Sequence, residues 1–150
     1  MLRTIFTDYD GVFHPISALH WFNLRLPVDV CIERGRLFRW TWILSEILEP
    51  HPDVRIVVHS SWRLLHPEYK VRELLGPLAA RYIGAISREY DRADGIVAYV
   101  EKHHISDYRI LDDHPECFPN GTTTLIHCDS ETGVYGSQVR IQLKNWLGKP

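Results

Sequence analysis

The sequence predicts an α/β protein with a doubly wound, mainly parallel sheet of five strands between two layers of helices. Short apolar or β-branched runs alternate along the chain with segments of helical periodicity, which is the pattern of consecutive βαβ units. Three of these runs end directly in acidic or hydroxyl side chains. Because a parallel sheet carries its ligand site outside the carboxyl ends of its strands, we expect a site at that edge.

Size and composition favour one soluble domain over residues 1–150. The chain is 45% hydrophobic and 24% charged, with a net charge of -2, so no broad basic surface for nucleic acid is predicted. The 3 cysteines are widely spaced and do not favour a disulfide framework. No apolar run reaches the roughly 18 residues of a membrane span. The first strand begins too early for a signal peptide, so we expect a cytoplasmic protein with no membrane association.

The first part of the chain predicts two strands around one long helix. The first strand covers Leu2–Thr7, and an irregular segment, Gly11–Leu26, follows it. That segment is long for a plain connection, so we expect a flap at about residues 12–30 that covers the site. Apolar residues at three- and four-residue steps predict a helix over Arg34–Leu48, and the β-branched run Val54–His59 predicts the second strand.

The rest of the chain continues the alternation of helices and strands without a repeat, a low-complexity tract or a linker. The expected elements are a helix over Glu68–Leu75, a turn over Leu78–Tyr82, a strand over Ile83–Ile86, a helix over Arg92–His103 begun by Asp91, strands over Tyr108–Leu111 and Thr122–Ile126, and a closing helix over Ser137–Leu147. We therefore expect a single domain.

Two pairs of aspartates stand at the ends of predicted strands. Asp8 and Asp10 are two residues apart, so they lie on the same side if the strand continues through them, and Gly11 permits a sharp turn. Asp112 and Asp113 end a later strand. Carboxylates that converge need a counter-charge, and Mg²⁺ prefers oxygen ligands and leaves room for a substrate phosphate. The sequence therefore predicts a Mg²⁺ site and a phosphorylated substrate.

The ordered motifs resemble those of the haloacid dehalogenase (HAD) superfamily of phosphohydrolases. The first motif of that family is matched by DYDGV at residues 8–12, the second by VVHS at 57–60, and the fourth by ILDD at 110–113. The stretches IVVHSSWR, LDDHPECF and DSETGV resemble the small HAD domains of Swiss-army-knife RNA-repair proteins. The resemblance covers about residues 2–147 and implies a Rossmann-like, three-layer HAD core with a minimal cap.

The resemblance implies a phosphatase that works through an aspartyl-phosphate. Asp8 becomes the nucleophile, and Asp10 becomes the general acid and then the base, with its backbone carbonyl on the metal. Ser60 is expected to hydrogen-bond to the transferring phosphoryl group. Asp112 is expected to bind Mg²⁺, with Asp113 as a second ligand or an outer-shell acceptor.

The family also requires a cation from the helix that precedes the fourth motif. No lysine stands in the expected place, and we choose Arg92 over Arg88 and Lys102 because it opens that helix. An arginine there can still neutralise phosphate oxygens. The further contacts expected to substrate are those of Gly11, Ser61 and Arg63.

Structural roles remain open for several of these residues. Either Ser60 or Ser61 could cap the next helix, and Asp113 could cap the turn before Pro115. Arg92 could be an ordinary solvated arginine. Trp62 is expected to be a core or rim aromatic. A histidine-ligated metal site is a further alternative, and its candidate ligands are His14, His59 and His114.

The function predicted is phosphate-ester hydrolysis at an open site. A site without a large cap can admit a nucleotide or the end of a nucleic acid, and no protein partner is evident. One alternative is a HAD-like module that binds metal and phosphate but has lost turnover. A receiver-like signalling domain is another, although its acid pair usually follows the first strand and its phosphorylated aspartate the third. A metal-dependent nuclease is the last alternative.

Overall fold

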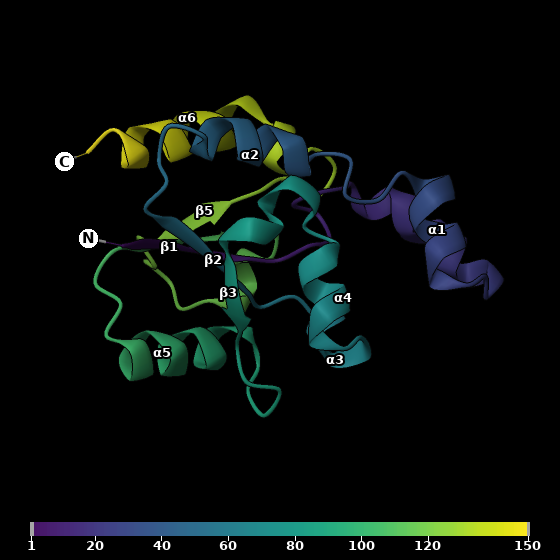
Figure 1. The fold of residues 1–150 in the computed structure, drawn as a ribbon, viewed down its shortest axis with the longest axis horizontal. Coiled ribbons are helices and arrows are strands. Elements are labelled where there is room, and N and C mark those ends of the chain that lie inside the picture. The colour runs from purple at the N-terminus through teal and green to yellow at the C-terminus, as the bar shows by residue number, and fades with distance from the viewer. Residues whose placement is uncertain (1, 150) are drawn as a thin grey trace.

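A computed structural model describes residues 2–149 and confirms the predicted doubly wound sheet. The strands are β1 (Arg3–Thr7), β2 (Val54–Val58), β3 (Tyr82–Ala85), β4 (Tyr108–Asp112) and β5 (Leu125–His127). They form one five-stranded sheet in the order β3-β2-β1-β4-β5, and every pairing is parallel (Figure 1). The chain therefore starts at the centre of the sheet and winds first to one edge and then to the other.

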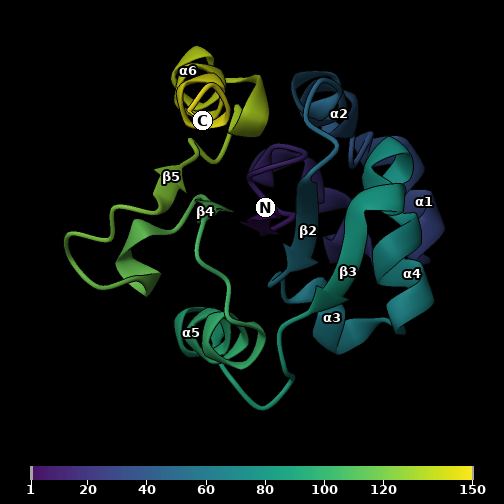
Figure 2. The same cartoon turned by 60° about the vertical axis from the view of Figure 1, so that its left-hand side comes forward.

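Helices cover both faces of the sheet. The helices α2 (Thr41–Leu48) and α6 (Ser137–Leu147) lie side by side on one face, and α5 (Arg92–His103) covers the other (Figures 1 and 2). The remaining helices are α1 (Val28–Gly35), α3 (Trp62–Leu65) and α4 (Glu68–Glu73), and 3-10 segments occupy Ile16–Leu24, Gly76–Arg81, Pro115–Cys117 and Gly133–Tyr135. Among residues 2–149, no helix is long and apolar enough to cross a lipid bilayer.

The strand period divides the apolar side chains between two cores. Ile5 packs with Leu44 and Leu143 in the larger core, which lies beneath α2 and α6. Its neighbour Phe6 packs with Ile96 in the smaller core, which lies beneath α5. Because both faces of the sheet are buried, the strands appear in the sequence as nearly continuous apolar runs, and this is why they could be recognised there.

The single helix predicted over Arg34–Leu48 is wrong. The helix α1 ends at Gly35, and α2 begins at Thr41. Between them, Arg36 and Phe38 have positive φ angles of 49° and 63°. The break turns the Phe38 ring onto the core around Trp62, at a centroid distance of 5.3 Å. Apolar spacing alone predicted one helix because it continues across this short turn without interruption.

The last strand also differs from its prediction, because it covers Leu125–His127 and not Thr122–Ile126. Both the backbone N–H and the hydroxyl group of Thr122 donate to the carbonyl of Pro119, at 3.3 and 2.6 Å. This local turn competes with strand pairing, which therefore starts three residues later. The helices α5 and α6 have their predicted bounds, and Asp91 caps α5 by accepting a hydrogen bond from the N–H of Asp94 at 3.0 Å.

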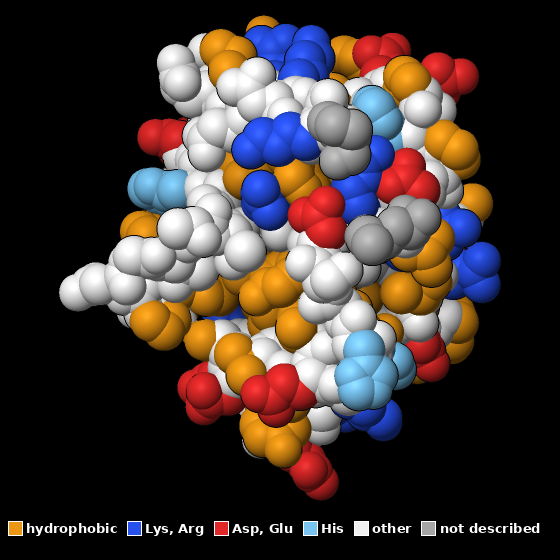
Figure 3. Space-filling model, turned by 90° about the vertical axis from the view of Figure 1, so that its left-hand side faces the viewer, with side chains coloured by type: hydrophobic (Ala, Val, Ile, Leu, Met, Phe, Trp, Pro, Cys, Tyr) orange, Lys and Arg blue, Asp and Glu red, His pale blue; other side chains and the backbone are white. Residues whose placement is uncertain are grey.

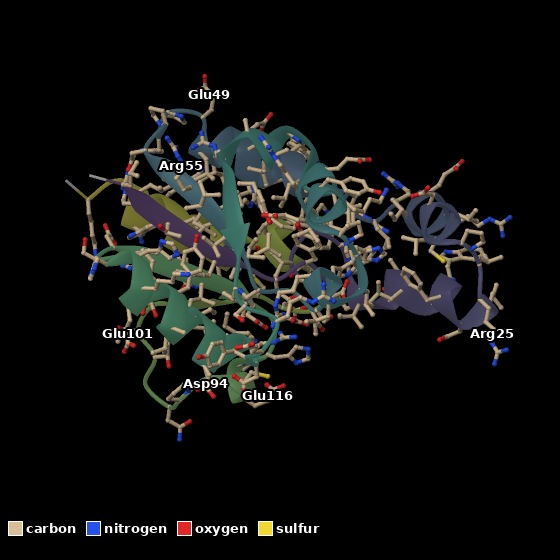
Figure 4. All side chains as sticks on the ribbon, turned by 60° about the horizontal axis from the view of Figure 1, so that its bottom comes forward. Arg25, Glu49, Arg55, Asp94, Glu101 and Glu116 are labelled. Carbon is tan, nitrogen blue, oxygen red and sulfur yellow. The ribbon has the colours of Figure 1, made fainter. Side chains whose placement is uncertain are left out.

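The segment after the first strand forms the most prominent projection of the molecule. The 3-10 segment Ile16–Leu24 leads into α1, and both lie beyond the sheet edge where the strands end, while the two termini lie on the opposite side (Figure 1). Arg25, between them, lies at the outer end of this projection (Figure 4). From here on we call residues 15–35 the flap, in place of the approximate bounds 12–30 that the sequence predicts.

Within residues 2–149, the opposite edge of the sheet, at the amino ends of the strands, carries no comparable acidic cluster. Its surface mixes basic, acidic and apolar side chains (Figure 3). A cavity of about 380 Å³ opens there beside Leu2, Ile83 and Tyr99, and none of the residues that line it is acidic. The chemistry predicted from the motifs therefore belongs to the carboxyl edge.

Candidate active site

Three buried aspartates gather where β1 and β4 end. One carboxylate oxygen of each of Asp8, Asp112 and Asp113 lies within 4.8 Å of the others. These three residues are 3%, 0% and 8% exposed, respectively. The backbone N–H of Asp8 donates to the carbonyl of Leu111 at 3.0 Å, so the pairing with β4 extends one residue beyond the end of β1 and holds the two aspartate segments together. We call these three residues the acidic cluster.

Arg92 supplies the positive charge of this cluster. Its Nη1 lies 3.0 Å from Oδ2 of Asp8, and 3.0 and 2.9 Å from the two carboxylate oxygens of Asp112. Burial opposes the charged guanidinium, but the two carboxylates outweigh it and raise the pKa of Arg92. This geometry contradicts the alternative that Arg92 is a solvated surface arginine.

The carboxylates of the cluster differ in their tendency to ionise. Burial raises the pKa of Asp8 to about 6, with a further increase from Asp112, although His59 and Arg92 act in the opposite direction. Burial also favours a raised pKa for Asp112. The hydrogen bond and charge of His59 and the charge of Arg92 outweigh this effect, so the pKa of Asp112 is lowered. Asp112 is thus the more strongly ionised of the two, and a further cation would favour the ionised form of Asp8.

His59 contacts the acidic cluster, a role that the sequence motifs did not predict. It is fully buried, and its Nε2 lies 2.8 Å from Oδ2 of Asp112. It follows β2 directly, and its backbone N–H donates to the carbonyl of Thr7 at 3.0 Å. The signal in the sequence was its position: His59 follows β2 as Asp8 follows β1, so the strand period directs both side chains to the α5 side.

The three histidines suggested as joint metal ligands contact different acids. His59 contacts Asp112, whereas Nε2 of His14 lies 2.7 Å from Asp10. His114 lies 2.8 Å from Glu116. Within the described residues, the acidic cluster is the one group of three potential ligands that meet, and it contains no histidine.

Asp113 has an unsatisfied carboxylate. Both of its oxygens are buried without a hydrogen bond, and the His114 ring is 3.6 Å from Oδ1. Burial raises its pKa. Gly11 makes room for this side chain: it has a φ of 76°, and a Cβ placed on it would collide with the Asp113 carboxylate. Three oxygen donors, one of them without a partner, fit a hard divalent cation such as Mg²⁺.

Asp10 lies apart from the acidic cluster. The inference that it shares a side with Asp8 required the strand to continue, but β1 ends at Thr7. Oδ1 of Asp10 instead faces Nε2 of His14 at 2.7 Å and Nε1 of Trp62 at 2.9 Å, and the side chain is 26% exposed. The role of its backbone carbonyl as a metal ligand stays a prediction.

The expected phosphate contacts after β2 have local partners. Ser60 is buried, and its Oγ accepts a hydrogen bond from the N–H of Trp62 at 3.2 Å, whereas Ser61 is exposed. Arg63 donates to the carbonyls of His59 and Ser60 at 2.8 and 3.0 Å, and to that of Tyr90 at 2.8 Å. Arg63 thus ties the end of β2 to the loop that leads to Arg92. The substrate contacts expected of Gly11, Ser60, Ser61 and Arg63 stay predictions.

An aspartate pair after the first strand, a serine after the second and an aspartate pair after the fourth, on a doubly wound parallel sheet, define a HAD-like domain. The chain belongs to the family described as the HAD domain in Swiss Army Knife RNA repair proteins, whose model matches residues 4–139. Searches of curated proteins and of solved structures found no match. The family supports a phosphohydrolase-like module.

Proposed function

We propose that this chain is a Mg²⁺-dependent phosphohydrolase that transfers the phosphoryl group of its substrate to Asp8. The observation that carries the proposal is the acidic cluster, in which Arg92 bridges Asp8 and Asp112 while Asp113 has no hydrogen-bond donor. A buried acid cluster with one cation and an unpaired carboxylate is suited to bind Mg²⁺, and a bound Mg²⁺ together with Arg92 would neutralise a phosphoryl group. The membership of the chain in the HAD family supports this role.

Asp8 has the local contacts expected of a nucleophile. Its Oδ1 accepts a hydrogen bond from the N–H of Tyr9 at 2.8 Å, which fixes the rotation of the carboxylate, and Oδ2 faces Arg92. In the proposed reaction a carboxylate oxygen of Asp8 attacks phosphorus, and the bond from phosphorus to the leaving oxygen breaks. Asp10 gives its proton to that oxygen.

Water completes the reaction. Asp10, now ionised, takes a proton from the water that attacks phosphorus, and the bond between phosphorus and Asp8 breaks. Free phosphate and the starting enzyme result. Arg92 neutralises charge on the phosphoryl oxygens throughout.

The acidic cluster is the proposed Mg²⁺ site, with Asp8, Asp112 and Asp113 as its carboxylate ligands. The bound ion would act as a Lewis acid that neutralises the transferring phosphoryl group. Asp10 contributes no side-chain oxygen to this group of ligands. Its side chain therefore remains available for proton transfer.

The substrate proposed is the terminal phosphate of a nucleotide or of a nucleic-acid end. The flap consists of one 3-10 segment and one short helix, which leaves the acidic cluster without a large cap. An open site of this kind can admit a bulky phosphate ester. The description of the family, which places such HAD domains in RNA repair proteins, supports a nucleic-acid end.

Phosphate release tests the proposal directly. Purified protein with Mg²⁺ should release phosphate from a generic aryl phosphate, and the Asp8→Asn variant should lose at least about a thousandfold in kcat, because an amide is a poor nucleophile. Asp29→Asn is the matched control, since Asp29 pairs with Lys70 on the flap surface and lies outside the acidic cluster. Full activity of Asp8→Asn would refute the nucleophile assignment.

One observation favours a second candidate, a module that binds metal and phosphate without turnover. Arginine occupies the position where HAD phosphatases have lysine, and Arg92 is already paired with both Asp8 and Asp112. Titration with beryllium fluoride separates the candidates. Tight Mg²⁺-dependent binding that requires Asp8 favours the enzyme, whereas metal and phosphate binding with neither beryllofluoride binding nor phosphate release favours the module.

A further inference from the structure

We propose that His14 and Trp62 are positioning residues that hold the acid Asp10 by one carboxylate oxygen, so that the other oxygen carries the proton for the leaving group. The inference deepens the proposed function and rests on it. It assigns a role to two residues on different elements, one at the base of the flap and one at the start of α3. Neither residue is expected to touch the substrate.

Both contacts reach the same atom of Asp10. Nε2 of His14 and Nε1 of Trp62 lie 2.7 and 2.9 Å from Oδ1, and the structure shows no hydrogen bond to Oδ2 within residues 2–149. His14 is fully buried and Trp62 is 5% exposed, whereas the Asp10 side chain is 26% exposed. An oxygen that accepts two N–H groups is a poor place for a proton, so a transferable proton belongs on Oδ2.

A backbone contact assigns the tautomer of His14. The N–H of Phe38 donates to Nδ1 of His14 at 3.1 Å, so Nδ1 is the acceptor of the ring. Nε2 of a neutral His14 therefore carries the hydrogen and donates it to Asp10. Trp62 can only donate, because an indole has no acceptor. Both partners thus present a donor to Oδ1, and their two hydrogen bonds fix the rotation of the carboxylate.

Aromatic packing holds the two donors in place. The Phe38 ring contacts His14 and Trp62 edge to face, with centroid distances of 4.9 and 5.3 Å. His66 stacks on Trp62 at 5.2 Å, and Phe22 of the flap approaches it at 6.0 Å. Because buried rings in contact with several neighbours lose little further freedom, they can orient an acid within the narrow limits that proton transfer requires.

A purely structural role would have a different signature from a positioning role. These contacts also join the flap to α3, so loss of either donor lowers stability whatever Asp10 does. Positioning of an acid, in contrast, matters in proportion to the need of the leaving group for a proton. An aryl oxide such as p-nitrophenolate leaves without one, whereas an alkoxide does not. The comparison of kcat/KM between the two substrates therefore isolates the role, because kcat/KM reports the steps up to the first irreversible bond cleavage.

The experiment uses Trp62→Phe, which keeps an aromatic ring at this position and removes the indole N–H that donates to Asp10. We expect its kcat/KM for an alkyl phosphate to fall at least about tenfold, and that for p-nitrophenyl phosphate to fall less than about twofold. Trp146→Phe is the matched control, because Nε1 of Trp146 donates to Asp107 at 2.8 Å in the same way but at a distant carboxylate. It should leave the ratio of the two substrates unchanged.

Substitution of His14 gives an independent test. His14→Gln keeps an N–H donor and should retain more activity on the alkyl phosphate than His14→Leu, which has none. Nitrogen-15 NMR of the parent protein at neutral pH should show a hydrogen on Nε2 and none on Nδ1 of His14. The opposite tautomer would overturn the inference without any measurement of activity.

The outcomes separate the inference from the proposed function. Equal losses on both substrates, or no loss on either, in a parent protein whose activity depends on Asp8 would overturn the positioning role and leave the phosphatase assignment intact. A parent protein that releases no phosphate from any ester, or an Asp8→Asn variant that remains active, would overturn the proposed function and this inference with it.

Discussion

The side chain of Arg92 offsets part of the electrostatic cost of burying the acidic cluster. Two ionised carboxylates at this depth are costly without a counter-charge, and Nη1 of Arg92 contacts both Asp8 and Asp112. His59 provides a second hydrogen bond to Asp112. Asp8 retains a raised pKa even so, and this residual cost of ionisation leads to a prediction about stability.

The stability of the metal-free protein should depend on the ionisation of Asp8. Its pKa of about 6 in the folded protein exceeds the ordinary 3.8, so the folded state binds its proton more tightly. The tighter proton binding by Asp8 stabilises the folded state. This contribution to the free energy of unfolding is fully present below pH 3.8 and is lost as the pH rises through 6. The free energy of unfolding of Asp8→Asn, which cannot ionise, should therefore rise relative to the parent by roughly 2–3 kcal/mol between these limits. Urea unfolding at several pH values measures it, and a pH-independent difference would contradict the assignment.

Position 11 requires glycine because a larger side chain there would collide with the carboxylate of Asp113. Gly11→Ala places a Cβ against the Asp113 carboxylate at a φ of 76°. We expect a loss of roughly 2–4 kcal/mol in the free energy of unfolding, together with weaker Mg²⁺ binding. Gly121→Ala is the control, because Gly121 has a φ of 80° but open space around it. It should show the backbone strain alone, and an equal loss in both variants would refute a steric role for Asp113.

At the scale of elements, α5 could be predicted in full because its signals are local. Asp91 is a cap residue, the apolar stripe is regular, and the bounds Arg92–His103 agree with the structure. The division between α1 and α2 could not be predicted, because the positive φ angles that mark it fall on Arg36 and Phe38, neither of which is a typical helix-ending residue. The packing of the Phe38 ring on Trp62 is a tertiary contact that apolar spacing does not reveal. The late start of the last strand likewise depends on a turn at Thr122, which competes with strand pairing.

The cap of α5 should affect the site because Arg92 is the first residue of that helix. Asp91→Ala removes the acceptor of the Asp94 N–H and should cost about 1 kcal/mol in the free energy of unfolding. It should also lower kcat, because the helix end that carries Arg92 loses its anchor. Asp91→Asn preserves an acceptor and serves as the control. Denaturant unfolding and phosphatase kinetics measure the two effects, and an unchanged kcat in a destabilised Asp91→Ala would contradict the link.

At the scale of the whole molecule, the parallel topology explains why the sequence located the site. The carboxyl ends of β1, β2 and β4 meet at one edge, so residues a hundred positions apart, such as Asp8 and Asp112, could be predicted to converge. The position of Asp10 could not be predicted, since it depends on where β1 ends and on donors from His14 and Trp62. The hydrogen-bond partners of Arg63 could not be predicted either, because they are backbone carbonyls, which sequence patterns do not identify.

The central claim is that Asp8 accepts the phosphoryl group, and chemical trapping tests it most directly. Protein mixed with Mg²⁺ and an aryl phosphate is quenched in acid during turnover and treated with borohydride, which reduces an acyl phosphate to an alcohol. Peptide mass spectrometry should then find homoserine at position 8, and none when Mg²⁺ is omitted or in Asp8→Asn. Phosphate release without this modification, or trapped phosphate on another residue such as His59, would contradict the account.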